Sequence, residues 1–194
     1  MFSLDSSPLK DSDSYFSRVL TELSEYWTTI KAIVPFQFYY RQNIGENCEI
    51  IGLPLMLYLL SFIAFWPQKH KIDAVISQDS SFTGIPAYFL SRTLKVPWIC
   101  EAHEEFLGTP YLAPGETIKD VFLKFVGRLL VTKATFVRAT SQRILKGLER
   151  IGVPKNRILY VRSNYIPPEF VTYAHSASKN VFTIGFVARI NRIK

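Results

Sequence analysis

Three groups of polar residues in the sequence have the chemistry of a catalytic or anion-binding site. His103 follows a short apolar run and lies beside Glu104, so an imidazole has a carboxylate neighbour. Asp79 lies in a polar turn after another apolar run. Arg189 and Lys194 are five residues apart after a third apolar run, and both are cations that bind phosphate oxygens. The types and spacing therefore suggest functional residues at two strand ends and a phosphate clamp after a third.

Each group also has a structural explanation. A lone histidine at the end of a strand can be a polar residue at the edge of the core. The Asp79 carboxylate can simply cap the helix that follows it, without contacting a ligand. Arg189 and Lys194 can belong to an exposed basic tail. The residue pattern alone leaves these alternatives open, so the elements that position the residues have to be considered.

Residues 71–106 are the stretch around which the fold is organised. They predict a strand at 72–77, a helix at 82–94 and a second strand beginning at 98–100, with Pro97 between the helix and the second strand. Two strands joined by a helix of this length form a right-handed parallel unit. Ligands bind beyond the carboxyl ends of such strands. Asp79 and His103 lie at those ends, so we expect a site there.

The rest of the chain repeats this alternation and predicts an α/β fold with a doubly wound parallel sheet. The further helices are expected at residues 14–27, 117–132 and 142–150, and the further strands at 29–36, 134–139, 157–161 and 181–187. We expect loop at residues 1–13 and a polar surface excursion at 37–47. The loop at 108–115, rich in proline and glycine, directly follows the expected site and can cover a ligand.

Residues 50–66 are the most apolar stretch of the chain. Pro54 predicts a helix that begins near Leu53, which leaves about a dozen apolar residues before Pro67. A bilayer core of about 30 Å needs more than that, so we expect a helix buried in or docked on the protein, with a membrane-embedded helix as the alternative.

The composition and the absence of several motifs exclude some classes of protein. The 194 residues carry a formal net charge of +7, which favours anionic partners such as nucleotide phosphates or acidic lipid. Nucleic acid is disfavoured because no helix-turn-helix, zinc-finger or RNP signature occurs. The sequence also lacks a dinucleotide-binding fingerprint, a P-loop, a hydrolase nucleophile elbow and any Cys/His metal spacing. Two distant cysteines and a polar start without a secretory signal lead us to expect a cytoplasmic protein.

Several segments together resemble the retaining glycosyltransferases of family 4, which have the GT-B fold. Residues 134–171, ATFVRATSQRILKGLERIGVPKNRILYVRSNYIPPEFV, are similar to the end of their amino-terminal domain. Residues 186–194, FVARINRIK, are similar to the entry of their second domain, and residues 77–106 resemble their central unit. The resemblance implies transfer of a sugar from a nucleotide-sugar with retention of configuration, between two Rossmann-like domains, with no metal or other cofactor.

The resemblance assigns roles to individual residues. His103 matches the histidine that lies near the acceptor and the transferring sugar, and we take it as the catalytic residue. Arg189 and Lys194 match the pair that holds the donor diphosphate. The residues that we place on the acceptor side or between the domains are Asp79, Glu104, Ser141 and Asn164.

The resemblance also sets expected boundaries. Residues 1–172 correspond to the acceptor-side domain, and residues 173–194 to a linker and the first strand of a nucleotide-sugar-binding domain. Ala188 stands where the family has glycine. The family's first strand, which is central in this topology, and most of its second domain have no counterpart in the sequence. We therefore expect a fragment that is inactive by itself, with the determinants of the donor beyond Lys194.

The expected partners are a nucleotide-sugar donor and a glycan or lipid-linked acceptor, as in polysaccharide biosynthesis at the cell envelope. The apolar stretch at 50–66 and the basic helix at 117–133 suggest peripheral contact with the inner face of an anionic membrane. Two alternatives remain open. One is a sugar-nucleotide 2-epimerase of the same architecture, and the other is a membrane-associated binding module without enzymatic activity.

Overall fold

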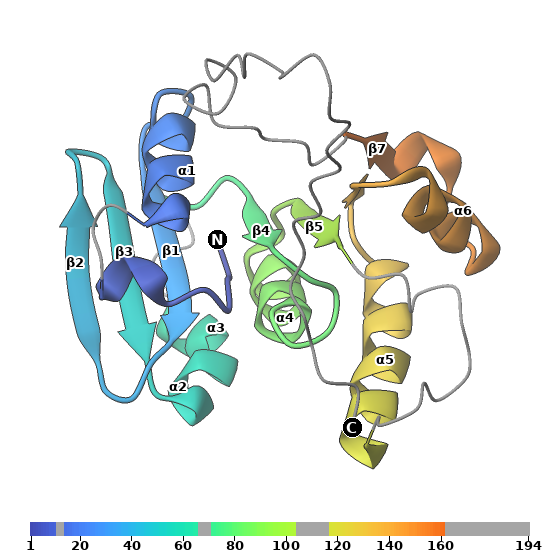
Figure 1. Ribbon diagram of the computed structural model, residues 1–194, viewed down its shortest axis with the longest axis horizontal. Helices are drawn as coiled ribbons and strands as arrows, with labels where there is room; N and C mark the ends of the chain where they lie inside the picture. Colours follow the sequence, from blue (N-terminus) through green and yellow to red (C-terminus); the bar gives the residue numbers. More distant parts are fainter. Residues whose placement is uncertain (11–13, 66–70, 104–116, 162–194) are drawn as a thin grey trace, which may run out of the picture.

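The computed structural model describes residues 1–10, 14–65, 71–103 and 117–161. The described α-helices are α1 Tyr15–Ser24, α2 Leu55–Leu59, α3 Ser61–Ala64, α4 Gly84–Leu94, α5 Ile118–Val131 and α6 Gln142–Arg150, and the 3₁₀ turns are η1 Ser7–Leu9 and η4 Lys155–Arg157. The strands are β1 Ile30–Pro35, β2 Tyr40–Ile44, β3 Cys48–Leu53, β4 Val75–Ser77, β5 Trp98–Ala102, β6 Phe136–Ala139 and β7 Ile158–Tyr160. Strands and helices alternate along most of this range (Figure 1).

The strands form two groups that lie side by side. One has the order β1-β3-β2 and the other has the order β4-β5-β6-β7. All neighbours in the second group are parallel, as are β1 and β3, whereas β2 is antiparallel to β3. Parallel strands with helices between them confirm the predicted α/β class and its parallel sheet.

Residues 1–3 join the two groups. Phe2 forms a parallel bridge to Ile33 of β1 and another to Ser77 of β4. Its N–H donates to the Ile76 carbonyl over 2.7 Å, and its carbonyl accepts from the Gln78 N–H over 3.1 Å. On the other side Ser3 N–H donates to the Ile33 carbonyl over 3.1 Å. The amino terminus therefore lies between β1 and β4 (Figure 1).

This finding corrects the expectation that residues 1–13 are all loop, because Phe2 bridges two strands. A regular first strand is still missing from the described residues, as expected, since only the isolated bridges at Phe2 occupy its place. With residues 1–3 counted as the first strand, the strands β1 and β3 follow on one side and β4, β5 and β6 on the other. That order is the doubly wound one, in which the chain reverses direction across the sheet at its first strand. Three residues are enough to hold the two halves in register because the first strand is hydrogen-bonded on both edges.

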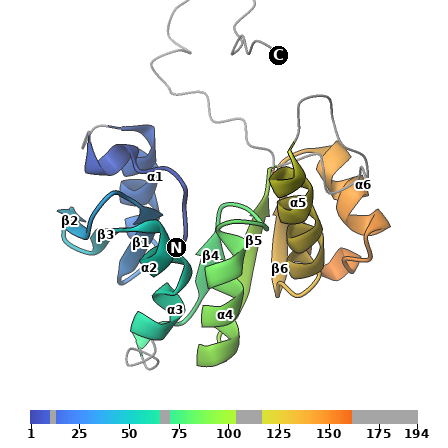
Figure 2. The ribbon, with the colours of Figure 1, turned by 90° about the horizontal axis from the view of Figure 1, so that it is seen from below.

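The core has two layers because successive side chains of β1 point to opposite faces. Ala32 and Val34 pack with Phe16 and Leu20 of α1. Ile33 packs on the other face in a larger cluster that contains Leu90 of α4. Figure 2 accordingly shows α1 on one side of the strands and α4 on the other.

The structure corrects two predictions between residues 37 and 66. The polar segment at 37–47 is not an irregular excursion, because it contains β2, the antiparallel edge strand. The apolar stretch at 50–66 does not begin as a helix, because its first part belongs to β3, which is buried at all six positions. The helix begins after Pro54, as the proline predicts, but breaks into the short helices α2 and α3.

The other helices follow the sequence signals closely. Ser14 caps α1 and Ser141 caps α6, each through its side-chain oxygen. Thr117 and Asp120 form a reciprocal capping box at the start of α5. These caps satisfy N–H groups that have no partner within the helix. They explain why the predicted starts at residues 14, 117 and 142 agree with the structure to within one residue.

Candidate functional site

The candidate site lies at the carboxyl edge of the sheet, where the doubly wound order reverses. Three expected site residues follow three neighbouring strands: Asp79 follows β4, His103 follows β5 and Ser141 follows β6. Because β4, β5 and β6 are parallel neighbours, their carboxyl ends lie at one edge. The structure therefore brings these residues to the edge where ligands bind in folds of this kind.

The short first strand also ends at this edge. Ser3 Oγ lies 2.5 Å from Gln78 Oε1, and the same Ser3 oxygen accepts from the Asp5 N–H over 2.9 Å. The Ser3 carbonyl accepts a hydrogen bond from the buried Tyr58 hydroxyl over 3.4 Å. These bonds connect the start of the chain to the turn after β4, so the edge between β1 and β4 is a fixed surface.

Asp79 is occupied with the turn that starts α4. Its Oδ1 accepts from the Ser81 N–H at 2.7 Å and from the Thr83 N–H at 3.1 Å. The Thr83 hydroxyl in turn accepts from the Asp79 N–H at 2.9 Å. These contacts give Asp79 a structural role in the turn before α4, whose N-cap residue is Thr83. Ser141 is likewise occupied as a cap, since its Oγ accepts from the Ile144 N–H at 3.2 Å.

His103 has a different environment because its partner is a charged side chain. Its Nε2 lies 3.1 Å from Glu101 Oε2, and the other carboxylate oxygen accepts from Arg138 Nη1 over 2.6 Å. The His103 side chain is 41% exposed, whereas that of Glu101 is 16% exposed. The carboxylate is thus held within the sheet, and the imidazole it contacts faces outward at the edge.

The charge of Glu101 follows from these contacts. Burial by itself would raise the pKa of Glu101, but the hydrogen bonds from His103 and Arg138 and the positive charge of Arg138 outweigh it. The pKa therefore lies below its usual value, and Glu101 is a carboxylate at neutral pH. An ionised carboxylate accepts hydrogen bonds only, so His103 Nε2 is the donor in this contact. The opposite ring nitrogen, Nδ1, is left as the atom that can meet a ligand.

Neighbouring buried groups do not supply a nucleophile. Burial raises the pKa of the Cys100 thiol, and the charges of Asp79 and Glu101 raise it further against an opposing hydrogen bond with Ser77. Burial likewise raises the pKa of the Tyr58 hydroxyl. Thiols and phenols in this state stay protonated at neutral pH. His103 is therefore the titratable side chain at this edge that is both accessible and oriented by a partner within the described ranges.

Sequence reasoning missed the partners of His103. It predicted a strand that begins at 98–100 but did not identify Glu101, which belongs to β5 and pairs in register with Arg138 of β6. A signal was available, because each of these strands is apolar except for one charged residue, and the two charges are opposite. Ser3 gave no such signal, since a strand of three residues has no recognisable pattern.

Other expected site residues lie outside the described ranges. These residues are Glu104, Asn164, Arg189 and Lys194. The same holds for three predicted segments: the loop at 108–115, the linker that begins at 173 and the strand at 181–187. No group of three or more His, Cys, Asp or Glu side chains suited to a metal ion occurs among the described residues.

Comparison with known families identifies the domain. The family of the glycosyl transferase 4-like domain matches residues 34–163, which cover most of the described fold and include His103. The chain belongs to this family, and its class of activity is that of a glycosyltransferase. No curated protein matches the sequence. Among the described helices, none combines the length and the apolar character that a membrane span requires.

Proposed function

We propose that this chain is the acceptor-side domain of a retaining glycosyltransferase that takes sugar from a nucleotide-sugar. The observation that carries the proposal is the Glu101–His103 contact at the carboxyl edge of a glycosyl transferase 4-like domain. An imidazole whose Nε2 is held by a buried carboxylate presents Nδ1 in a fixed direction. In this role His103 Nδ1 accepts a hydrogen bond from a hydroxyl of the transferring sugar or of the acceptor.

The donor diphosphate is assigned to Arg189 and Lys194 on the resemblance described above. Two cations on a diphosphate stabilise the negative charge that develops as the sugar leaves. Because charge stabilisation comes from side chains in this scheme, it needs no metal ion.

Contact with an anionic membrane is proposed for α5, which supports a lipid-linked acceptor. Phe122 and Phe125 are 62% and 59% exposed, and Ile118 and Leu129 continue the same exposed side of the helix. The helix also carries Lys124 and Arg128. Exposed apolar side chains with cations beside them are typical of helices that lie in the lipid interface. This feature also favours the alternative of a membrane-binding module, so the function has to be tested directly.

The test is a transfer assay on the native protein, isolated from its own cells through an antibody to residues 1–161. A panel of radiolabelled nucleotide-sugars is supplied with a lipid and glycan extract as acceptor. We expect label to enter the acceptor fraction from one donor, with the anomeric configuration of the donor retained in the product. Inversion of the configuration at C2 of the labelled sugar without an acceptor would favour the epimerase, and lipid binding without either reaction would favour the binding module.

A further inference from the structure

A cavity of about 580 Å³ opens at the amino edge of the sheet, opposite to the edge that carries His103. Its walls come from α4, from the segment between α5 and β6, and from the last residue before β7. The helices α4 and α5 are neighbours beside it (Figure 2). Sites for small ligands have volumes of about 300–1,000 Å³. This amino-edge cavity is therefore large enough for a small molecule and separate from the candidate catalytic site.

Three cations line the amino-edge cavity, and no acidic side chain does. They are Arg92 of α4, Lys133 after α5 and Arg157 before β7. Within the part of the chain that the structure describes, none of these three side chains forms an ion pair or a hydrogen bond. Like charges at one cavity repel each other, and an anion between them removes that cost. The cavity is therefore suited to a ligand with negative charge.

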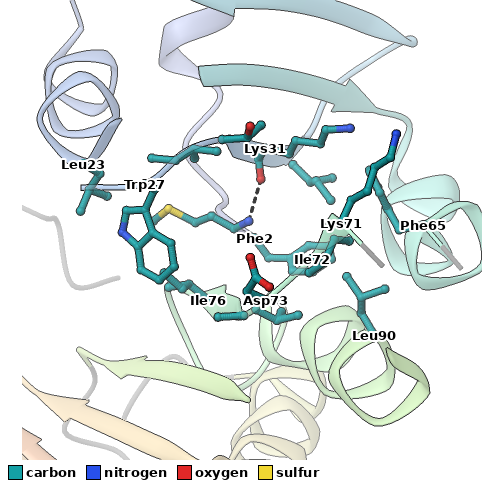
Figure 3. A pocket seen from close by; sticks show the side chains of 16 residues that line it. Phe2, Leu23, Trp27, Lys31, Phe65, Lys71, Ile72, Asp73, Ile76 and Leu90 are labelled. Carbon is teal, nitrogen blue, oxygen red and sulfur yellow. Dashed lines mark hydrogen bonds between the residues drawn. The ribbon is translucent and has the colours of Figure 1, made fainter. Parts of the chain in front are cut away.

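Cations elsewhere in the described fold have acidic partners. Arg138 donates to Glu101 over 2.6 Å, and even the exposed Lys155 lies 3.6 Å from Glu149. The cavity between β1 and β4 is lined mainly by apolar side chains, and its two lysines share it with Asp73 (Figure 3). The lack of an acidic side chain distinguishes the amino-edge cavity from both of these settings.

The end of α5 does not account for Lys133. Lysine often lies at the end of a helix because its ammonium group interacts with the last carbonyls. Here such carbonyls already have donors. The Leu129 carbonyl accepts from the Thr132 hydroxyl over 2.8 Å. The Leu130 carbonyl accepts from the Lys133 N–H over 2.8 Å. The Lys133 ammonium is therefore not needed at the helix end and can meet a ligand.

Part of the cavity wall is fixed to the sheet. Thr135 N–H donates to the Trp98 carbonyl over 2.9 Å, and Thr135 Oγ1 accepts from the Trp98 N–H over 3.1 Å. The Tyr88 ring packs edge-on against the buried Trp98 indole, with the ring centroids 6.1 Å apart. Because Oγ1 acts as an acceptor in its bond to Trp98, the Thr135 hydroxyl hydrogen remains available as a donor. A held donor thus accompanies the three cations.

We propose that the amino-edge cavity binds a phosphate group through Arg92, Lys133 and Arg157. The Thr135 hydroxyl is a further donor. A guanidinium group binds two phosphate oxygens at once, and an ammonium group adds a point charge, so the set suits a phosphate with two negative charges. The phosphate can belong to a soluble compound or to a lipid headgroup, since the exposed apolar side of α5 reaches Leu129, four residues before Lys133.

The test titrates inorganic pyrophosphate into the full chain at low salt and follows binding by calorimetry. Every protein carries Arg189→Gln, so that the donor-binding pair proposed above does not contribute. We expect Arg92→Gln and Arg157→Gln each to weaken binding about tenfold, as the loss of a hydrogen bond between charged groups does. Arg150→Gln is the matched control, because Arg150 is an exposed cation at the end of α6 outside the cavity. It should change the affinity less than twofold.

A second readout locates the ligand and identifies its source. Lysines are acetylated chemically with and without the ligand, and mass spectrometry gives the rate at each position. Pyrophosphate should slow the reaction of Lys133 at least fivefold and leave that of Lys146, exposed on α6, unchanged. Protection of Lys133 by vesicles of phosphatidic acid, and not by pyrophosphate, would assign the site to a lipid headgroup, and the reverse would assign it to a soluble phosphate.

Two results would overturn the proposal. One is that neither pyrophosphate nor the vesicles protect Lys133. The other is that Arg150→Gln weakens binding of the active probe as much as Arg92→Gln does, because the attraction would then belong to the whole basic surface. Both results concern the amino edge in a background without Arg189, so neither bears on the proposed sugar transfer at the carboxyl edge.

Discussion

Glu101 of β5 and Arg138 of β6 lie opposite each other in the parallel register and are joined by a hydrogen bond of 2.6 Å. The second oxygen of the same carboxylate contacts His103. One acidic side chain thus links the interior of the sheet to the residue that we assign to catalysis. The pair stabilises the fold and also orients the imidazole, and these two roles can be measured separately.

Replacing Glu101 by glutamine should destabilise the protein by about 1–3 kcal/mol, the cost of losing hydrogen bonds between charged groups that are largely buried. The amide keeps the shape of the side chain but cannot accept from both His103 and Arg138 with the strength of a carboxylate. Urea unfolding followed by circular dichroism measures the change. Glu149→Gln is the matched control, because its partner Lys155 is 84% exposed and 3.6 Å away. We expect less than about 0.5 kcal/mol for the control.

The same carboxylate should contribute to acid unfolding. Its folded pKa is below the usual value, so its contribution to stability is complete above the unfolded pKa of about 4.3 and is lost as pH falls through the folded pKa. The stability difference between wild type and Glu101→Gln should therefore shrink as the pH is lowered from 5 to 3. A difference that stayed constant over this range would show that Glu101 is not stabilised as a carboxylate.

Asp79 offers a test of capping against ligand contact. Asparagine keeps an oxygen that can accept from the Ser81 and Thr83 N–H groups, so Asp79→Asn should change stability by less than about 0.5 kcal/mol, whereas Asp79→Ala should cost about 1–3 kcal/mol. Transfer activity separates the two roles. If Asp79 acts only in the turn, the asparagine variant keeps the wild-type rate. A loss of more than tenfold in that stable variant would place the carboxylate on a substrate.

Membrane contact through α5 can be checked by co-sedimentation with vesicles that contain anionic phospholipid. The double change Phe122→Ser and Phe125→Ser should reduce the bound fraction at least fivefold, because it removes two exposed apolar side chains from one side of the helix. Phe38→Ser is the control, since Phe38 is also exposed but lies before β2. Equal losses in both variants would argue against a docking face on α5.

Much of the parallel unit could be predicted from the sequence because its signals are local. A helix of fixed length between two apolar runs defines the β4-α4-β5 unit, and capping residues mark the starts of α5 and α6. The secondary structure of the apolar stretch at 50–66 was harder to predict, because an apolar run has the same composition in a buried strand as in a buried helix. Its first part became β3 because it pairs with β1 on one edge and with β2 on the other.

The candidate site was predictable in position more than in detail. Strand ends that carry His103, Asp79 and Ser141 could be identified, since parallel strands end at one edge. The link from His103 through Glu101 to Arg138 depends on the register of β5 against β6, which no local pattern specifies. The role of residues 1–3 depends on hydrogen bonds to two strands that are distant in sequence.

The most direct test of the proposed function is the transfer rate of the native protein with His103→Ala, measured against Arg150→Ala. Arg150 is an exposed cation at the end of α6, away from the carboxyl edge. We expect the His103 variant to lose at least a hundredfold in kcat with a smaller loss of thermal stability than Glu101→Gln, because the Arg138 bond to Glu101 remains, while the Arg150 variant stays within twofold of wild type in kcat. A His103 variant that transfers sugar at the wild-type rate would contradict the assignment of this edge as the catalytic site.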